Sequence, residues 1–528
     1  MCLSDEAQFF QLLDSFFLLS PPSFSARLVL VLRSVLLVSV LSPHSSSCFS
    51  PRGCCLCVPG QPEKALALVD ESISHTPTPP DSYMLKARIY KHAGDPVTAY
   101  GFMDVARRLD TQDRYLNVKC VRYALRADEL KKAESTVLLF IRDGDGLKAL
   151  EDLQAMWYEN AAAELHLRAK SYGKALKKLV AINKHFVDIM EDQFDFHSYC
   201  LRKSTLRAYV DMIRWGNTMR GHKYHVRAAF NLVRTYLRIF DAPREASEHF
   251  ESMALESNLN EEQRKEEAKR LKKAAAKARA AEEKQAAAEA AAKLAAMPKG
   301  KQPKPGEEDP DPDGALLAAV ADPLAEASKY FAHLANLHSS ALATHTLGVA
   351  LFVRKARFLL ALKHLQKALA IDAAHPDTHA ALCAFLVAVR APGVTEGLHP
   401  IVREFITTAT ATEQFGAGAP VAQLNSTYLS KHAASLPARL AVARTLLVLD
   451  PLANKAEATT LASQIDPAQS FSRQDATESL SFLVDSVRAS PEVVEAFKAR
   501  ALKRFPFAVA FGAKPAPPPA IDAQQSKE

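Results

Sequence analysis

The chain has 528 residues, enough for three or four domains of about 150 residues or for one long repeat array. Hydrophobic residues make up 48% and charged residues 24%, so most of the chain is expected to be globular rather than disordered or fibrous. Lys and Arg number 66 against 59 Asp and Glu, and a net charge of +7 is too small to demand a nucleic-acid partner. The low glycine count of 18 argues against Gly-rich β folds and glycine-fingerprinted nucleotide folds.

Residues 1–59 share no periodicity with the rest of the chain. The apolar stretch 28–41 contains Arg33 and is shorter than the roughly 20 residues that span a bilayer, and acidic residues precede it, unlike a secretory signal. Five of the eight cysteines lie here without the Cys-x-x-Cys spacing of a zinc site: Cys2, Cys48, Cys54, Cys55 and Cys57. We expect an unrelated or disordered leader, or an alternative or wrongly assigned start.

From residue 60 the pattern predicts helices of ten to fifteen residues joined by short polar turns. Segment 80–113 matches positions 4, 8, 11, 15, 20, 24 and 27 of a 34-residue tetratricopeptide unit with Tyr83, Ala87, Tyr90, Gly94, Ala99, Met103 and Ala106. Small residues at positions 8, 20 and 27 let the two helices of a hairpin approach closely. The large residues fill the gaps between hairpins.

The same register recurs along the chain. Steps of 34 residues connect Ala65, Ala99 and Ala133, and Ala175 follows after a further 42. A later unit includes Phe352, Ala361, Leu365, Ala368 and Pro376. The sequence therefore predicts an all-α tetratricopeptide-type superhelix, an α-solenoid of helix hairpins. Residues 60–77 supply only the second helix of a unit, so we expect that an upstream helix belongs before them.

A charged segment, 258–322, is expected to interrupt the array. It divides helical repeats at 60–257 from helical repeats at 323–512, and the Pro-rich tail 513–528 is expected to be disordered. Its first part is an Ala, Glu, Lys and Arg helix former with basic residues Arg264, Lys265, Lys269, Arg270, Lys272 and Lys273, and a flexible linker follows. These cations favour either a solvated helix held by Glu–Lys pairs or a ribosome, RNA or nuclear-import contact.

Motifs of catalysis are missing from the sequence. It contains neither a Gly-x-Ser-x-Gly elbow nor a Walker loop. His185 and His197 bracket several acidic residues, but their spacing crosses a helix break, so we expect a local polar network rather than a metal site. We therefore predict a chain that does not catalyse a reaction and binds no metal or cofactor itself.

One basic constellation predicts anion binding. Cations occur at the ends of successive predicted helices, and in a solenoid such ends stack along one rim: Arg88, Lys91, Arg107, Arg114, Lys119 and Arg122. They could converge on a polyanion. The alternative is that the rim is charged for solubility.

Several strings resemble the auxiliary (large) subunits of the N-terminal acetyltransferase A complex. They cover residues 86–94, 192–211, 435–440, 449–451 and 505–511, and Asp192–Asp211 is the most specific. The resemblance extends over about residues 60–511. It implies a non-catalytic superhelix that wraps and activates a small catalytic acetyltransferase in a heterodimer.

The resemblance further implies that acetyl-CoA is used by the partner, which acetylates nascent chains at the ribosome. Members of the family can bind inositol hexakisphosphate at the subunit interface, and we carry this over to the rim cations. A cytoplasmic, partly ribosome-associated protein with a nuclear fraction is implied, with no membrane or specific DNA partner. The alternatives from the residues are a stand-alone tetratricopeptide adaptor and a truncated, non-functional isoform, since the family carries more repeats upstream.

Overall fold

The computed structural model describes residues 62–141, 146–192, 199–200, 203–256, 311, 313–394, 397–466 and 471–516. Within these ranges the regular structure is entirely helical, which confirms the predicted all-α class. The chain divides into two compact units, residues 1–116 with 516–528 and residues 117–515. The described helices of the first unit are α4 (Pro62–His75), α5 (Pro80–Ala93) and α6 (Pro96–Leu109), and α7 (Arg114–Arg126) spans the division.

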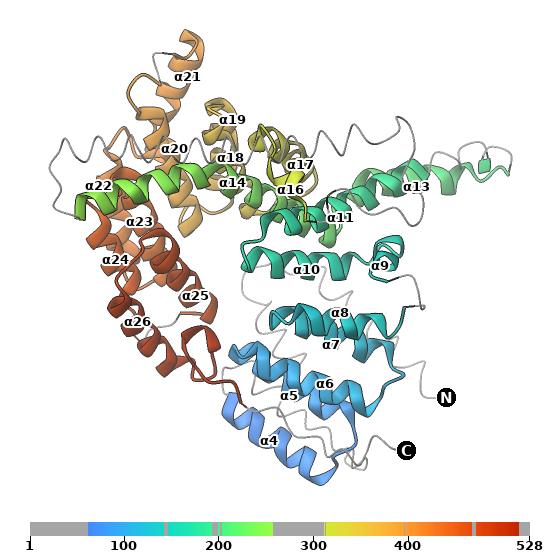
Figure 1. Cartoon of the computed structure of the whole chain (residues 1–528). Coiled ribbons are helices and arrows are strands. Elements are labelled where there is room, and N and C mark those ends of the chain that lie inside the picture. Colours follow the sequence, from blue (N-terminus) through green and yellow to red (C-terminus); the bar gives the residue numbers. More distant parts are fainter. Residues whose placement is uncertain are drawn as a thin grey trace, which may run out of the picture. The chain divides into compact units, whose positions relative to one another are not determined.

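Successive helices of the second unit pack in pairs, such as α10 with α11 and α18 with α19 (Figure 1). Up to the charged segment they are α8 (Leu130–Leu138), α9 (Lys148–Asp152), α10 (Met156–Arg168), α11 (Tyr172–Asp192), α13 (Leu206–Met219) and α14 (Lys223–Glu256). The short helix α16 (Ala315–Ala318) lies at the end of the charged segment. After it come α17 (Pro323–Leu337), α18 (Leu342–Arg354), α19 (Phe358–Ile371), α20 (Pro376–Arg390), α21 (Pro400–Thr410), α22 (Val421–His432), α23 (Leu436–Leu449), α24 (Lys455–Ser463), α25 (Arg473–Ser481) and α26 (Pro491–Arg504).

The hairpin α5–α6 follows the predicted 34-residue unit. Ala87, Ala99 and Ala106 are completely buried, as expected of small residues where two helices cross closely. Gly94 ends α5 in the left-handed conformation, with φ of 106°, which a residue with a Cβ adopts only at a cost. One residue later Asp95 accepts a hydrogen bond from the Thr98 amide and caps α6. The turn is therefore encoded locally.

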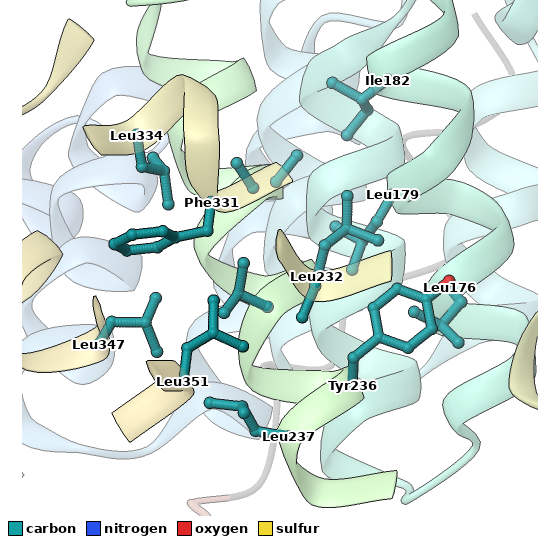
Figure 2. Close-up of a cluster of buried hydrophobic side chains, with 14 of the residues drawn as sticks. Leu176, Leu179, Ile182, Leu232, Tyr236, Leu237, Phe331, Leu334, Leu347 and Leu351 are labelled. Atoms are coloured by element: carbon teal, nitrogen blue, oxygen red, sulfur yellow. The ribbon is translucent and has the colours of Figure 1, made fainter. Parts of the chain in front are cut away.

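The largest core of the second unit joins helices from both sides of the charged segment. Leu176 and Leu179 of α11 and Leu232 of α14 lie in one buried cluster with Phe331 of α17 and Leu351 of α18 (Figure 2). The insertion of 258–322 therefore interrupts the sequence but leaves this hydrophobic core continuous. Two helices of this core are longer than the predicted ten to fifteen residues: α11 has 21 residues and α14 has 34.

The end of the charged segment packs against the start of α11. Lys177 Nζ donates to the Asp311 carbonyl over 2.7 Å, and Lys174 pairs with the Asp313 carboxylate at 3.2 Å. Gly173 allows this approach, since a Cβ there would lie 2.5 Å from the Asp313 carbonyl oxygen. The basic residues predicted between 264 and 273 lie outside the described residues.

The C-terminal helices form two further buried clusters. One centres on α18–α20 with Ala361, Leu365 and Phe385, and the other on α23–α26 with Leu440 and Phe497. Helix α23 is buried nearly all round, against α20, α22, α24 and α25. Helix α23 is therefore the central helix among these five.

Candidate anion-binding and partner-binding surfaces

The six rim cations are distributed over both compact units. Arg88, Lys91, Arg107 and Arg114 belong to the first unit, and Lys119 and Arg122 to the second. Their joint convergence on one polyanion stays a prediction.

In the first unit Asp104 neutralises part of the predicted rim. Its carboxylate accepts from Arg107 at 2.7 Å and from Arg108 at 2.6 Å, one helical turn apart on α6. Arg88 is exposed on α5, whereas Lys91 is half-buried at the end of the same helix. Cations in the last turns of α5 and α6 also suit the negative end of the helix dipole, so part of their role is explained by helix stability.

The second unit contains a basic pocket. A cavity of about 90 Å³ is lined by residues of α7, α10 and α14, including Trp157 and four arginines: Arg122, Arg126, Arg168 and Arg227. The Arg122 guanidinium lies over the Trp157 indole, 5.0 Å from its centroid. This cation–π contact holds the guanidinium in place without cancelling its charge.

Two of the four arginines are paired with carboxylates. Arg168 contacts Asp128 at 2.7 Å, and Arg227 forms a two-point ion pair with Glu164. Arg122 and Arg126 form no ion pair among the described residues. The pocket therefore keeps a positive charge excess in its wall.

A buried acceptor adds to the polar character of this pocket. The Asn160 amide donates to the carbonyls of Met156 and Tyr224, but its Oδ1 is buried with no hydrogen-bond partner. An unmet buried acceptor is costly, and it would be satisfied by a ligand or water that donates a proton to it. The pocket thus combines cations, an aromatic wall and a buried acceptor without a hydrogen-bond partner.

The sequence predicted only part of this pocket. Arg122 was singled out, and Arg126, four residues further along the same helix, shares its face and could have been added from spacing alone. Arg168 and Arg227 come from helices far along the chain, and nothing in their local sequence marks them. Tertiary packing brings them to the pocket.

The predicted polar network around His185 involves a different partner. His185 Nε2 lies 2.8 Å from the Glu159 carboxylate of α10, and the Glu159 side chain is completely buried. His197 lies outside the described residues. Within the described ranges no group of three or more His, Cys, Asp or Glu side chains is placed to hold a metal ion.

The described helices were compared with the length and apolar character that a membrane-spanning helix requires. No helix among them is both long enough and apolar enough to cross a bilayer.

The described residues define a helix-hairpin repeat protein. A family profile described as "N-terminal acetyltransferase A, auxiliary subunit" matches residues 58–368. This match covers more than half of the chain, and the chain belongs to that family.

Individual relatives agree. The chain is 38% identical over 470 residues to the N-terminal acetyltransferase A complex auxiliary subunit NAA15 of Arabidopsis thaliana, covering 86% of this chain and 51% of the relative. It is 36% identical over 416 residues to the human N-alpha-acetyltransferase 16, NatA auxiliary subunit, covering 77% and 47%. The chain thus spans about half the length of the curated relatives it matches.

A solved structure supports the same fold. The structure of Naa15/Naa10 bound to HypK-THB contains a chain that is 31% identical and superposes with a TM-score of 0.52. The match covers 66% of this chain and 44% of that one. The predicted helical solenoid class is therefore confirmed.

Proposed function

We propose that this chain is a non-catalytic auxiliary subunit that scaffolds and activates the catalytic subunit of an N-terminal acetyltransferase. The observation that carries the proposal is the family match across residues 58–368 on a helix-hairpin array. A pre-ordered helical surface loses little conformational entropy when it binds a small enzyme, so it can hold the enzyme's substrate loops in one geometry. Acetyl-CoA would be bound and used by the partner.

The test is reconstitution with a purified catalytic subunit. We expect a one-to-one complex that acetylates Ser- or Ala-starting peptides faster than the catalytic subunit alone. Binding without a change of rate or specificity would refute the activating role. Absence of binding by a folded chain would favour the two alternatives, a stand-alone adaptor or a truncated, non-functional isoform.

A second proposed activity is binding of an inositol polyphosphate. It is supported by Arg122 and Arg126, which line the basic pocket without carboxylate partners, and by Lys119 on the same helix. Arginine guanidinium groups form strong charge-assisted hydrogen bonds to phosphate. The four candidates of the first unit remain predicted contributors.

Calorimetric titration with inositol hexakisphosphate tests this activity. Arg122→Ala should weaken binding at least tenfold, and Arg88→Ala reports separately on the first unit. Lys132 of α8 is exposed and pairs with Glu129, the residue that precedes this helix, so Lys132→Ala offers a matched control. Equal affinity of wild type and Arg122→Ala would refute the assignment.

The ribosome contact and the cellular location are also proposals. We propose that the cations between residues 264 and 273 bind the ribosome, with the protein cytoplasmic, partly ribosome-associated and partly nuclear. Association with purified ribosomes should fall steeply with salt, and the salt dependence should vanish when these residues become Gln. A salt-independent interaction would refute this role.

A further inference from the structure

The turn between α5 and α6 is buried, unlike comparable turns further along the chain. In the α7–α8, α10–α11 and α18–α19 turns the left-handed residues are Asp128, Lys170 and Ala356, and all three are exposed. Gly94 has the same place between α5 and α6 but is buried, and Asp95 after it is only 2% exposed. Connecting turns normally run over the surface of a protein. A further segment of the chain is therefore expected to lie over this turn.

A C-terminal segment reaches this turn. The Thr98 side chain, in the first turn of α6, is 1% exposed, and its hydroxyl donates to the Ala516 carbonyl over 3.1 Å. The Thr98 amide donates to the Asp95 carboxylate in the helix cap, so the hydroxyl is the group that contacts the second segment. Ala516 belongs to the same compact unit as α5 and α6. The contact is thus internal to the first unit.

The sequence around Ala516 suits an extended segment that offers acceptors. Residues 513–516 are outside any helix. Lys514 and Ala516 each precede a proline, and a residue before proline is held in extended conformations. Proline has a carbonyl but no N–H, so such a segment presents more acceptors than donors. It therefore fits a site that donates, as the Thr98 hydroxyl does, and its stiffness lowers the entropy lost on docking.

We propose that the α5–α6 turn is a docking site for an extended, proline-flanked segment, and that residues 513–516 of this chain occupy it as an intramolecular strap. The strap covers the residues that cap α6, so its docking protects the start of that helix. Because occupant and site belong to one chain, the occupant is present at a high effective concentration. The role of the strap is independent of the proposed acetyltransferase partner.

The first experiment shortens the chain and measures hydrogen exchange of peptides that cover residues 94–101. A stop after Gly512 removes the strap but keeps Phe511, which is buried in the α23–α26 cluster. Exchange at 94–101 should become about fivefold faster or more, while exchange of α23 stays unchanged. A stop after Pro518 keeps the strap and should leave the full protection. Equal exchange in both shortened chains would overturn the proposal.

The second experiment removes only the hydrogen bond. Thr98→Val keeps the shape of the side chain and the Asp95 cap, and it should speed exchange at 94–101 about threefold, the effect of one typical hydrogen bond. In the matched control Thr427→Val, the lost hydroxyl is exposed and donates within α22 to the Gln423 carbonyl, so exchange at 94–101 should stay as in wild type. Unchanged exchange in Thr98→Val would overturn the role of the hydroxyl.

The third experiment supplies the strap as a separate molecule. A synthetic peptide of residues 513–520 is added at about 10 mM to the chain that stops after Gly512, since the effective concentration of a short tether is on the order of 1 mM. It should restore protection at 94–101, and the same peptide with Pro515 and Pro517 replaced by Gly should restore less. Absence of any restoration would overturn the docking site, even if the shortened chain has lost protection through partial unfolding of α6.

Discussion

A buried histidine pair makes the α18–α19 hairpin sensitive to acid. His364 Nδ1 lies 3.0 Å from His345 Nδ1, and the His364 ring packs against Phe331 and Phe352. Burial, with a further effect of the neighbouring His345, lowers the pKa of His364 from 6.5 to about 4. A charge on both rings at this separation would be unfavourable, because like charges repel.

The sign of the pH effect follows from that difference. In the unfolded chain His364 binds its proton near pH 6.5, while the folded chain resists protonation until about pH 4. Stability from this group is therefore complete above pH 6.5 and is lost as the pH falls toward 4. The loss amounts to about 2 kcal/mol at pH 5 and to about 3 kcal/mol at most.

Hydrogen exchange of the α19 amides, corrected for intrinsic rates, measures this locally. Between pH 7 and pH 5 the protection of wild type should fall about 20-fold more than that of His364→Phe, which keeps a ring but cannot ionise. His399 is exposed beside α21, so His399→Gln should behave as wild type. The same pH dependence in wild type and His364→Phe would refute the reasoning.

Three further predictions concern separate regions. Gly173→Ala should detach the turn at 313–314 from α11, because the new Cβ would lie 2.5 Å from the Asp313 carbonyl oxygen, and hydrogen exchange of α16 should rise while that of α23 stays unchanged. Phe385→Ala should destabilise the α18–α20 cluster by about 3–5 kcal/mol in urea unfolding, since the ring is fully buried, and a loss below about 1 kcal/mol would contradict that packing. Asp104→Asn should strengthen inositol hexakisphosphate binding severalfold by releasing Arg107 and Arg108, and unchanged calorimetric affinity would exclude this part of the rim.

Much of the local architecture is readable from sequence spacing. Ala87, Ala99 and Ala106 were expected at hairpin crossings, and all three are completely buried. Gly94 matches position 15 of the predicted unit, and in the structure it ends α5 with a positive φ. These positions are predictable because neighbouring residues determine where a helix turns and how long a loop is. In a repeat protein the same spacing also occurs several times along the chain.

Other features depend on residues that are distant in sequence. The basic pocket is lined by Arg168 and Arg227 together with Arg122, and no local sequence pattern predicts that these side chains lie close together. The sequence composition predicts that the charged segment separates two sets of helical repeats. In the structure, α11 and α14 before that segment share one buried cluster with α17 and α18 after it. A core depends on which apolar faces meet in space, and chain connectivity does not reveal that.

The sequence by itself determined the helix-hairpin class and the resemblance to acetyltransferase auxiliary subunits. The class follows from the repeat spacing, and the resemblance follows from long, specific strings of residues. Tertiary structure alone decided which charges are neutralised. Arg168 pairs with Asp128, which lies 40 residues away in the sequence, whereas Arg439 is buried without a carboxylate among the described residues, and the local sequence indicates neither outcome. Whether a charge is paired or exposed depends on the three-dimensional neighbours that surround it, since these set both its hydration and its counter-charge.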